Sequence, residues 1–172
     1  HALFAVADTV RAHSRAAIAE LHALGIRTLM LSGDNSQTVR AIAAQVGIDE
    51  AHGDLLPEDK LAHIAARGSE GAVIGMVGDG INDAPALARA DIGFAMGAAG
   101  TGTAIETADV ALMDDDLRKL PQFVRLSRHT HRLLVQNIVI ALGIKAAFLV
   151  LTLAGLGTMW MAVFADVGAS LI

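Results

Sequence analysis

Apolar and polar residues alternate along the first 120 residues in blocks typical of short strands and amphipathic helices. The apolar runs that we expect to form strands are residues 2–8, 26–32, 72–77, 91–96 and 109–113. The stretches with helical spacing of apolar residues are 9–25, 36–47, 55–68 and 84–90. Short strands that alternate with helices of this length predict an α/β domain with a mostly parallel sheet covered by helices on both faces.

Residues that favour helix ends lie at the borders of these blocks. Thr9 is expected to cap the first helix, and Pro57 suits the first turn of the third, where a backbone N–H has no helical partner. Glycines at positions 25, 47 and 68 are expected to end the first three helices, because glycine readily adopts the left-handed conformation of a helix terminus.

The hydrophobic pattern changes after residue 132. Between Val135 and Leu156 the single charged residue is Lys145. The stretch from 134 to 157 would be about 36 Å long as a helix, enough to cross a hydrocarbon core of about 30 Å. After a short turn, residues 159–172 begin a second apolar stretch. The pattern therefore predicts two transmembrane helices, the second of them truncated.

The expected division of the chain is a soluble domain over 1–120, a basic connector over 121–132, a transmembrane helix over 133–157, and the start of a last transmembrane helix over 158–172. Arginines crowd the connector, and positive residues stay on the cytoplasmic side. We expect a multi-pass protein of the plasma or inner membrane, with residues 1–132 in the cytoplasm. Because the chain begins without methionine and ends inside an apolar run, we expect it to be a piece of a longer protein.

Composition narrows the classes of function. Hydrophobic residues make up 53% of the chain and aromatic residues 3%, which is apolar for a soluble domain. A net charge of −5 disfavours nucleic-acid binding. Since the chain has no cysteine, a disulfide framework and a thiolate metal site are excluded within these residues. Any metal here would need oxygen or imidazole ligands.

Three polar clusters lie at or beside the expected carboxyl ends of strands, where parallel sheets bind ligands. They are Ser32-Gly33-Asp34, Lys60, and Asp79 with Asn82 and Asp83. Two carboxylates among glycines suit Mg²⁺ bound together with a phosphate, and a hydroxyl and an ammonium would complete the phosphate site. Alternatively, Asp79 and Asn82 merely form a tight turn. The occurrence of all three clusters in order favours the site.

Two charged residues fall inside the apolar tail. By position, Lys145 and Asp166 both lie at the depth of the hydrocarbon interior, where an isolated charge costs at least about 2.5–3.5 kcal/mol. A pair that faces the protein interior is therefore favoured. The alternative is that Lys145 extends toward the interface and that Asp166 has no partner.

The strings "LSGDN", "LLPEDK" and "MVGDGINDAPAL" resemble, in order and spacing, the phosphorylation domain of P-type ATPases, which are cation pumps of the haloacid-dehalogenase-like superfamily. The resemblance covers essentially all of residues 1–132. It implies a Rossmann-like α/β fold for this part of the chain, of which it would be the C-terminal portion.

The same resemblance implies roles for the three clusters. Asp79 would ligate Mg²⁺, and Asn82 and Asp83 would support that site and the phosphate. Ser32, Gly33 and Asp34 would stand in the family's Thr-Gly-Asp motif, with serine in place of threonine. Lys60 would be the lysine that neutralises the phosphoryl group.

In the tail, "NIVIALGIK" followed by "ADVGAS" is similar to the last two spans of the zinc/cadmium/lead-exporting branch of heavy-metal P-type ATPases. This implies that Asp166 ligates the transported ion and that Lys145 is its partner. The strings expected of a copper exporter or a cobalt-type pump do not occur in these residues.

The aspartate that becomes phosphorylated in the family lies in Asp-Lys-Thr-Gly-Thr, and this string is missing from the 172 residues. The nucleotide-binding domain, which would bind most of the substrate ATP, would also lie upstream. The chain alone is therefore predicted to be inactive and to depend on the remainder of the same polypeptide.

The predicted function of the parent protein is ATP-driven export of Zn²⁺, Cd²⁺ or Pb²⁺ through an aspartyl-phosphate intermediate, with Mg²⁺ as cofactor and the lipid bilayer as surroundings. Three alternatives stay open. They are a membrane-anchored Mg²⁺-dependent phosphatase of the same superfamily, a pump of the same family for Cu⁺ or Co²⁺, and a non-catalytic regulatory fragment.

Overall fold

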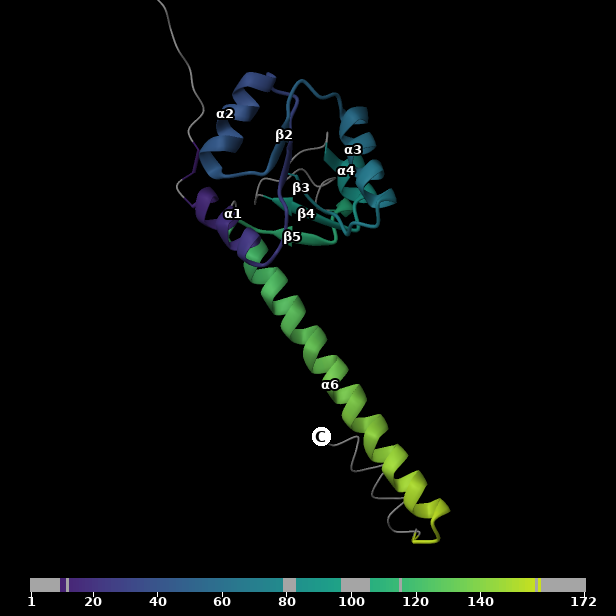
Figure 1. Ribbon diagram of the computed structural model, residues 1–172. Coiled ribbons are helices and arrows are strands. Elements are labelled where there is room, and N and C mark those ends of the chain that lie inside the picture. Colours follow the sequence, from purple (N-terminus) through teal and green to yellow (C-terminus); the bar gives the residue numbers. More distant parts are fainter. Residues whose placement is uncertain are drawn as a thin grey trace, which may run out of the picture. The chain divides into compact units, whose positions relative to one another are not determined.

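The computed structural model describes residues 10–11, 13–78, 83–96, 106–114, 116–156 and 158 (Figure 1). The chain divides into two compact units, His1–Pro121 and Gln122–Ile172. In its described part, the first unit contains short strands and helices in alternation, and the second contains most of one long helix.

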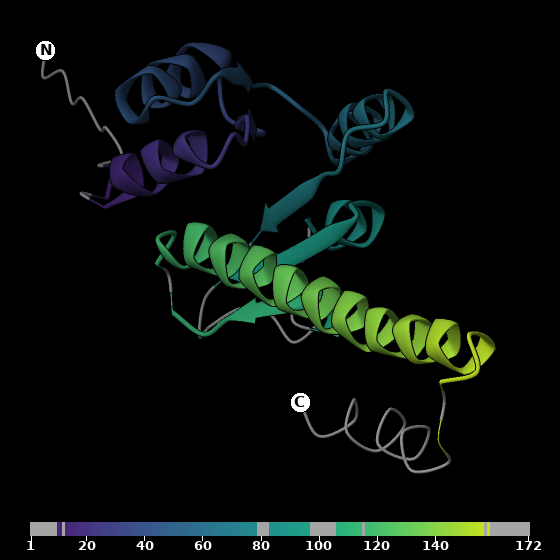
Figure 2. The same cartoon turned by 60° about the horizontal axis from the view of Figure 1, so that its bottom comes forward.

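The strands of the first unit pair in parallel. They are β1 (Leu29–Leu31), β2 (Glu50–His52), β3 (Gly75–Gly78), β4 (Ile92–Met96) and β5 (Val110–Leu112). β1 pairs with β2. β3, β4 and β5 lie side by side in that order (Figure 1 and Figure 2). The predicted parallel pairing is confirmed. Within the described residues it forms a two-stranded and a three-stranded sheet.

The helices of this unit pack on the strands and on one another. They are α1 (Ser14–Ala23), α2 (Ser36–Val46), α3 (Pro57–Ser69) and α4 (Ala84–Arg89). α2 packs against β2 and α1, while α4 packs against β3, β4 and α3 (Figure 1). In α2 the buried residues Val39, Ala43 and Val46 recur at helical spacing on one face. Leu87 of α4 and Ala95 of β4 form the centre of a second buried cluster.

Three predicted helix ends are confirmed. Gly25 follows the C-cap residue of α1 with a φ of +77°. Gly47 follows α2 with a φ of +85°, the left-handed conformation that glycine adopts without a steric penalty. Pro57 is the first residue of α3. Asn35 caps α2, because its side-chain oxygen accepts a hydrogen bond of 2.8 Å from the backbone N–H of Gln37.

Other predicted boundaries are wrong. The first helix begins at Ser14 rather than after Thr9, and His13 at its N-cap position makes no side-chain cap bond. Thr9 and the expected strand 2–8 lie outside the described residues. α3 continues through Gly68 to Ser69, and the left-handed residue after it is Gly71, with φ +80°.

Strand β2 was not predicted. Two of its three residues, Glu50 and His52, are polar, so the segment shows no apolar run. Pairing with β1 stabilises it instead, since backbone hydrogen bonds do not depend on side-chain polarity.

Helix α6 (Lys119–Leu153) has 35 residues and is about 52 Å long at 1.5 Å per residue. Among the described residues it is the one helix that is long and apolar enough to cross a membrane, judged by length and composition. None of the residues in its apolar window is buried. The predicted connector and the predicted first span both fall largely on this helix. Residues 159–172, predicted to begin the second span, lie outside the described residues.

Candidate functional site

The loop Ser32-Gly33-Asp34 follows β1 directly. The Ser32 hydroxyl donates a hydrogen bond of 2.9 Å to Oδ2 of Asp34, and the backbone N–H of Asp34 donates one of 3.2 Å to the hydroxyl oxygen. A Cβ atom added to Gly33 would lie 3.4 Å from the carbonyl oxygen of Leu55. The loop thus brings a hydroxyl and a carboxylate together at the carboxyl end of a strand, close to another backbone segment.

That segment is the chain that follows β2. The backbone N–H of Ser32 donates to the carbonyl of His52 at 3.0 Å, and the N–H of Leu55 donates to the carbonyl of Ser32 at 3.1 Å. The N–H of Asp54 donates to the carbonyl of Asp34 at 2.7 Å. Three backbone hydrogen bonds therefore fix the Ser32-Gly33-Asp34 loop on residues 52–55.

Residues 52–55 lead directly into α3, which carries Lys60 in its first turn. Asp59 accepts a hydrogen bond of 2.9 Å from the N–H of Leu56 and so caps the start of this helix. The backbone path from the loop to Lys60 is therefore short and hydrogen-bonded at both ends.

Lys60 contacts Asp83, which lies between β3 and α4. Its Nζ atom is 2.7 Å from Oδ1 of Asp83, and the two side chains are only 15% and 16% exposed. Asp83 stands at the N-cap position of α4, yet its side chain makes no cap bond. A Cβ atom on Gly78, the last residue of β3, would lie 2.7 Å from Cβ of Asp83, so only glycine fits there.

The structure thus brings Ser32 together with Asp34, and Lys60 together with Asp83. The Lys60–Asp83 contact itself was not predicted. Asp79 and Asn82 lie outside the described residues, although Asp79 follows the end of β3 in the sequence. Lys145 is an exposed residue of α6, and Asp166 lies outside the described residues.

The polar side chains that follow β1 and β3 offer oxygen atoms as possible metal ligands. The described residues contain no group of three or more histidine, cysteine, aspartate or glutamate side chains placed to hold a metal ion. The donors after the two strands, the hydroxyl of Ser32 and the carboxylate of Asp34 after β1 and the carboxylate of Asp83 after β3, are the hard oxygen type that Mg²⁺ prefers. In donor chemistry these residues fit such an ion.

Asp54, which follows β2 beside the Ser32-Gly33-Asp34 loop, was not predicted from the sequence. Asp54 has a φ of +56° and is the one non-glycine residue in the described part of the chain with positive φ. Its Oδ2 atom accepts hydrogen bonds from the backbone N–H of Ser36 at 3.0 Å and from the Ser36 hydroxyl at 2.5 Å. These hydrogen bonds hold the pKa of the Asp54 carboxyl below its usual range. The Gly-Asp pair ahead of Leu-Leu-Pro was the available signal, because such pairs mark turns.

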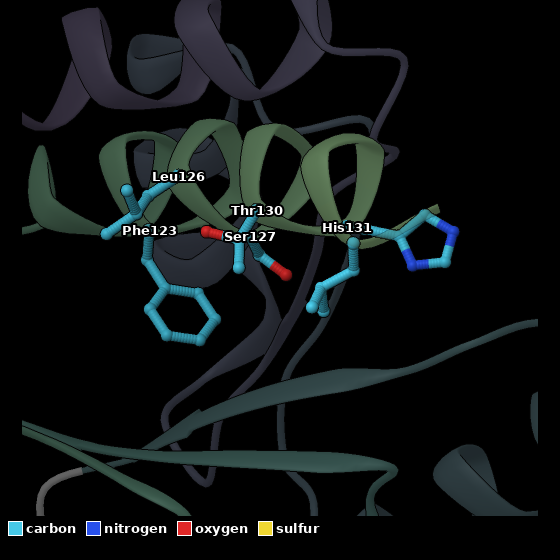
Figure 3. Close-up of a pocket in the computed structure, with 6 residues that line it drawn as sticks. Phe123, Leu126, Ser127, Thr130 and His131 are labelled. Atoms are coloured by element: carbon cyan, nitrogen blue, oxygen red, sulfur yellow. The ribbon is translucent and has the colours of Figure 1, made fainter. Parts of the chain in front are cut away.

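The second unit carries a hollow along one face of α6 (Figure 3). It is lined by apolar and hydroxyl side chains and one imidazole at helical spacing, namely Phe123, Leu126, Ser127, Thr130, His131 and Leu134. This lining contains no carboxylate and no lysine, so it lacks the charged groups that Asp34, Lys60 and Asp83 provide in the first unit.

Comparison with known proteins places these features in a family. The family model described as haloacid dehalogenase-like hydrolase matches residues 1–91, more than half of the 172 residues. The chain belongs to the haloacid dehalogenase-like hydrolase family. More narrowly, it is 54% identical over 171 residues to a probable cadmium-transporting ATPase of Listeria monocytogenes, a match that covers 99% of this chain and 24% of that protein.

Two further matches agree with this one. The chain is 49% identical over 170 residues to the zinc/cadmium/lead-transporting P-type ATPase of Escherichia coli K12, covering 99% of the chain and 23% of that protein. It superposes on a crystal structure of a zinc-transporting PIB-type ATPase in the E2.Pi state with a TM-score of 0.89 and 49% identity, covering 96% of this chain and 27% of the other. The predicted resemblance to heavy-metal P-type ATPases is confirmed, and the chain spans about a quarter of the length of these relatives.

Proposed function

We propose that this chain is part of an ATP-driven pump that exports Zn²⁺, Cd²⁺ or Pb²⁺, and that it comprises the C-terminal portion of the phosphorylation domain and the membrane helix that follows. The observation that carries the proposal is the 54% identity to a cadmium-transporting ATPase along 99% of the chain. The paired polar side chains of the α/β unit, Ser32 with Asp34 and Lys60 with Asp83, support it.

In this proposal the Ser32-Gly33-Asp34 loop and Lys60 bind the phosphoryl group. The loop offers a hydroxyl, and the absence of a side chain at Gly33 lets a phosphoryl oxygen approach the backbone. The Lys60 ammonium has three donors, and its contact with Asp83 uses one of them. Asp83 therefore orients Lys60, while the positive charge offsets the charge of the phosphoryl group.

Mg²⁺ is the proposed cofactor, with Asp79 as its ligand and with Asn82 and Asp83 in support. When bound, the ion would neutralise negative charge on the phosphoryl oxygens. The close approach of Gly78 to Asp83 supports this placement, because it holds a carboxylate at the end of the strand that Asp79 follows.

The phosphoryl acceptor and the adenine-binding residues are proposed to belong to the rest of the polypeptide. The string Asp-Lys-Thr-Gly-Thr does not occur in the 172 residues. ATP is the substrate of the complete protein, and this chain contributes the phosphoryl-binding and Mg²⁺-binding side chains.

The transport function is assigned to the tail. α6 is the proposed span, in the plasma or inner membrane, with residues 1–132 in the cytoplasm. Asp166 is the proposed ligand of the transported ion and Lys145 its partner, because a lysine on a span is expensive unless an opposite charge meets it.

The proposal is tested by measuring ATP hydrolysis of the complete pump, reconstituted in vesicles, with Zn²⁺, Cd²⁺, Pb²⁺, Cu⁺ and Co²⁺ in turn. We expect stimulation by the first three ions and none by the last two. Asp166→Ala should remove the stimulation, while Asp114→Ala, a change at an exposed ion pair of the soluble unit, should leave it intact. Stimulation by Cu⁺ or Co²⁺ alone would contradict the metal assignment, and metal-independent phosphatase activity would contradict the pump.

A further inference from the structure

Two aspartates at opposite ends of β2 make the same kind of contact. Asp49, just before the strand, accepts hydrogen bonds from the backbone N–H of Thr28 at 2.7 Å and from the Thr28 hydroxyl at 3.0 Å. Asp54, just after it, accepts the corresponding pair from Ser36 at 3.0 and 2.5 Å. Only Asp54 lies at the end of β2 that is next to the Ser32-Gly33-Asp34 loop, which follows β1.

At that end the two backbones are in tight contact. A Cβ atom on Gly53 would lie 2.6 Å from both the carbonyl oxygen of Asp34 and the Cα atom of Ser36. Asp54 contacts the segment from Asp34 to Ser36 at both of its ends. Its N–H donates to the Asp34 carbonyl at 2.7 Å, and its carboxylate accepts from Ser36. One residue therefore binds both the last residue of the loop, Asp34, and the first residue of α2, Ser36.

Stabilising the start of α2 accounts for only part of this arrangement. Asn35 accepts from the N–H of Gln37, and the Asp54 carboxylate accepts from the N–H of Ser36, a second of the four N–H groups that have no partner within the helix. The hydrogen bond from the N–H of Asp54 to the carbonyl of Asp34 lies outside the helix and holds the loop. Asp54 is exposed, and it adopts a left-handed backbone conformation that residues with a Cβ atom rarely adopt, although aspartate tolerates it better than most. Strained residues that persist are typical of functional sites.

We propose that Asp54 is a positioning residue, which holds the Ser32-Gly33-Asp34 loop in register with Lys60 so that both bind one phosphoryl group. This inference rests on the proposed function. The contacts of Asp54 with Asp34 and Ser36 set the loop, and the four residues from Leu55 to Glu58 carry the same backbone into the helix that bears Lys60. Because phosphoryl binding depends on placement of these groups to within a fraction of an ångström, loosening the loop weakens it without unfolding the domain.

The test uses the complete pump in vesicles and inorganic vanadate, a phosphate analogue, as the probe. Asp54→Gly keeps the left-handed backbone accessible and removes the carboxylate, whereas Asp54→Asn keeps an acceptor oxygen for Ser36. Asp49→Gly and Asp49→Asn are the matched controls at the other end of β2.

We expect Asp54→Gly to raise the vanadate concentration for half-inhibition of ATP hydrolysis roughly tenfold, and Asp54→Asn to restore it to within about twofold of the unaltered pump. Asp49→Gly should leave the vanadate response unchanged. A purely structural role predicts instead that the two glycine variants shift the response equally or not at all, and either result would overturn the inference.

If Asp54→Gly does not yield a folded pump, Ser36→Ala removes the hydroxyl donor of the same contact. We expect it to weaken vanadate inhibition about threefold, and an unchanged response would count against the inference. Failure of the proposed function gives a different result, since the unaltered pump would then show neither vanadate inhibition nor a phosphorylated intermediate.

Discussion

The α/β unit and helix α6 use the same apolar residue types in opposite ways. In the first unit Val39 and Leu87 are 0% and 1% exposed, whereas Leu142 and Val150 on α6 are 63% and 64% exposed. Burial of an aliphatic side chain contributes about 1.5–3 kcal/mol, so the first unit is stabilised by its own core. The exposed face of α6 needs lipid or other helices to cover it. The difference shows that the first unit buries its apolar side chains in its own core, while α6 leaves them exposed for its surroundings to cover.

The largest effect is expected from a change that removes the proposed Mg²⁺ ligand of the α/β unit and leaves α6 unaltered. Asp79→Asn in the complete pump should abolish Mg²⁺-dependent formation of the phosphorylated intermediate from ATP, because the proposed ligand loses its charge. The measurement is incorporation of radiolabelled phosphate into the protein. Asp91→Asn is the control, since Asp91 accepts a hydrogen bond from the N–H of Ile74 and an amide oxygen can accept the same bond. Normal phosphorylation of the Asp79→Asn variant would refute the assigned role.

The next test compares two lysine–aspartate pairs of the same unit. Lys60→Gln should slow phosphorylation roughly a hundredfold, because a positioned cation at a phosphoryl group contributes about that much to the rate. Lys119→Gln breaks an ion pair of similar length, 2.6 Å, whose side chains are 42% and 56% exposed, and should change the rate little. Rapid-quench measurement of the phosphorylation rate distinguishes them. Equal effects of the two changes would mean that Lys60 acts through stability alone.

The contrast in burial predicts a difference in stability. Leu87→Ala should destabilise the α/β unit by about 2–5 kcal/mol, since it leaves a cavity beside Ala95. Leu142→Ala should cost less than about 1 kcal/mol if lipid covers its face of α6. Both changes in stability are measured by heating the complete pump and using proteolysis of the α/β unit to detect its unfolding. A large loss from Leu142→Ala would show that another helix packs tightly on that face.

The smallest expected effect concerns pH. Hydrogen bonds from His52 and then from Arg67 hold the pKa of the Glu50 carboxyl below its usual value. A lowered folded-state pKa contributes stability above the ordinary glutamate pKa, and that contribution is lost as pH falls through the folded-state value. The Tm of the unaltered protein should therefore exceed that of Glu50→Gln slightly at neutral pH, and the gap should close in acid. A gap that widens in acid would contradict this assignment.

How far the sequence predicted the site can be judged from particular residues. Pro57 and Gly47 were placed correctly because their backbone preferences are local. Ser32 and Lys60 were singled out through their motifs, yet neither the Lys60–Asp83 contact nor the function of Asp54 was expected. The Lys60–Asp83 contact and the contacts of Asp54 depend on where separate strands end in space. The spacing of residues within one segment does not show which residues of another segment lie beside it.

The alternation of strands and helices, the apolar tail and the resemblance to a pump family could all be predicted from the residues alone, because each follows from a local pattern or from strings such as "MVGDGINDAPAL". The contact between Lys60 and Asp83 at 2.7 Å, and the hydrogen bonds that join Asp54 to Asp34 and Ser36, became visible in the folded chain alone. These contacts join residues 18 to 23 positions apart, which meet because the strands pair and because Gly53 and Gly78 allow a close approach of the backbone.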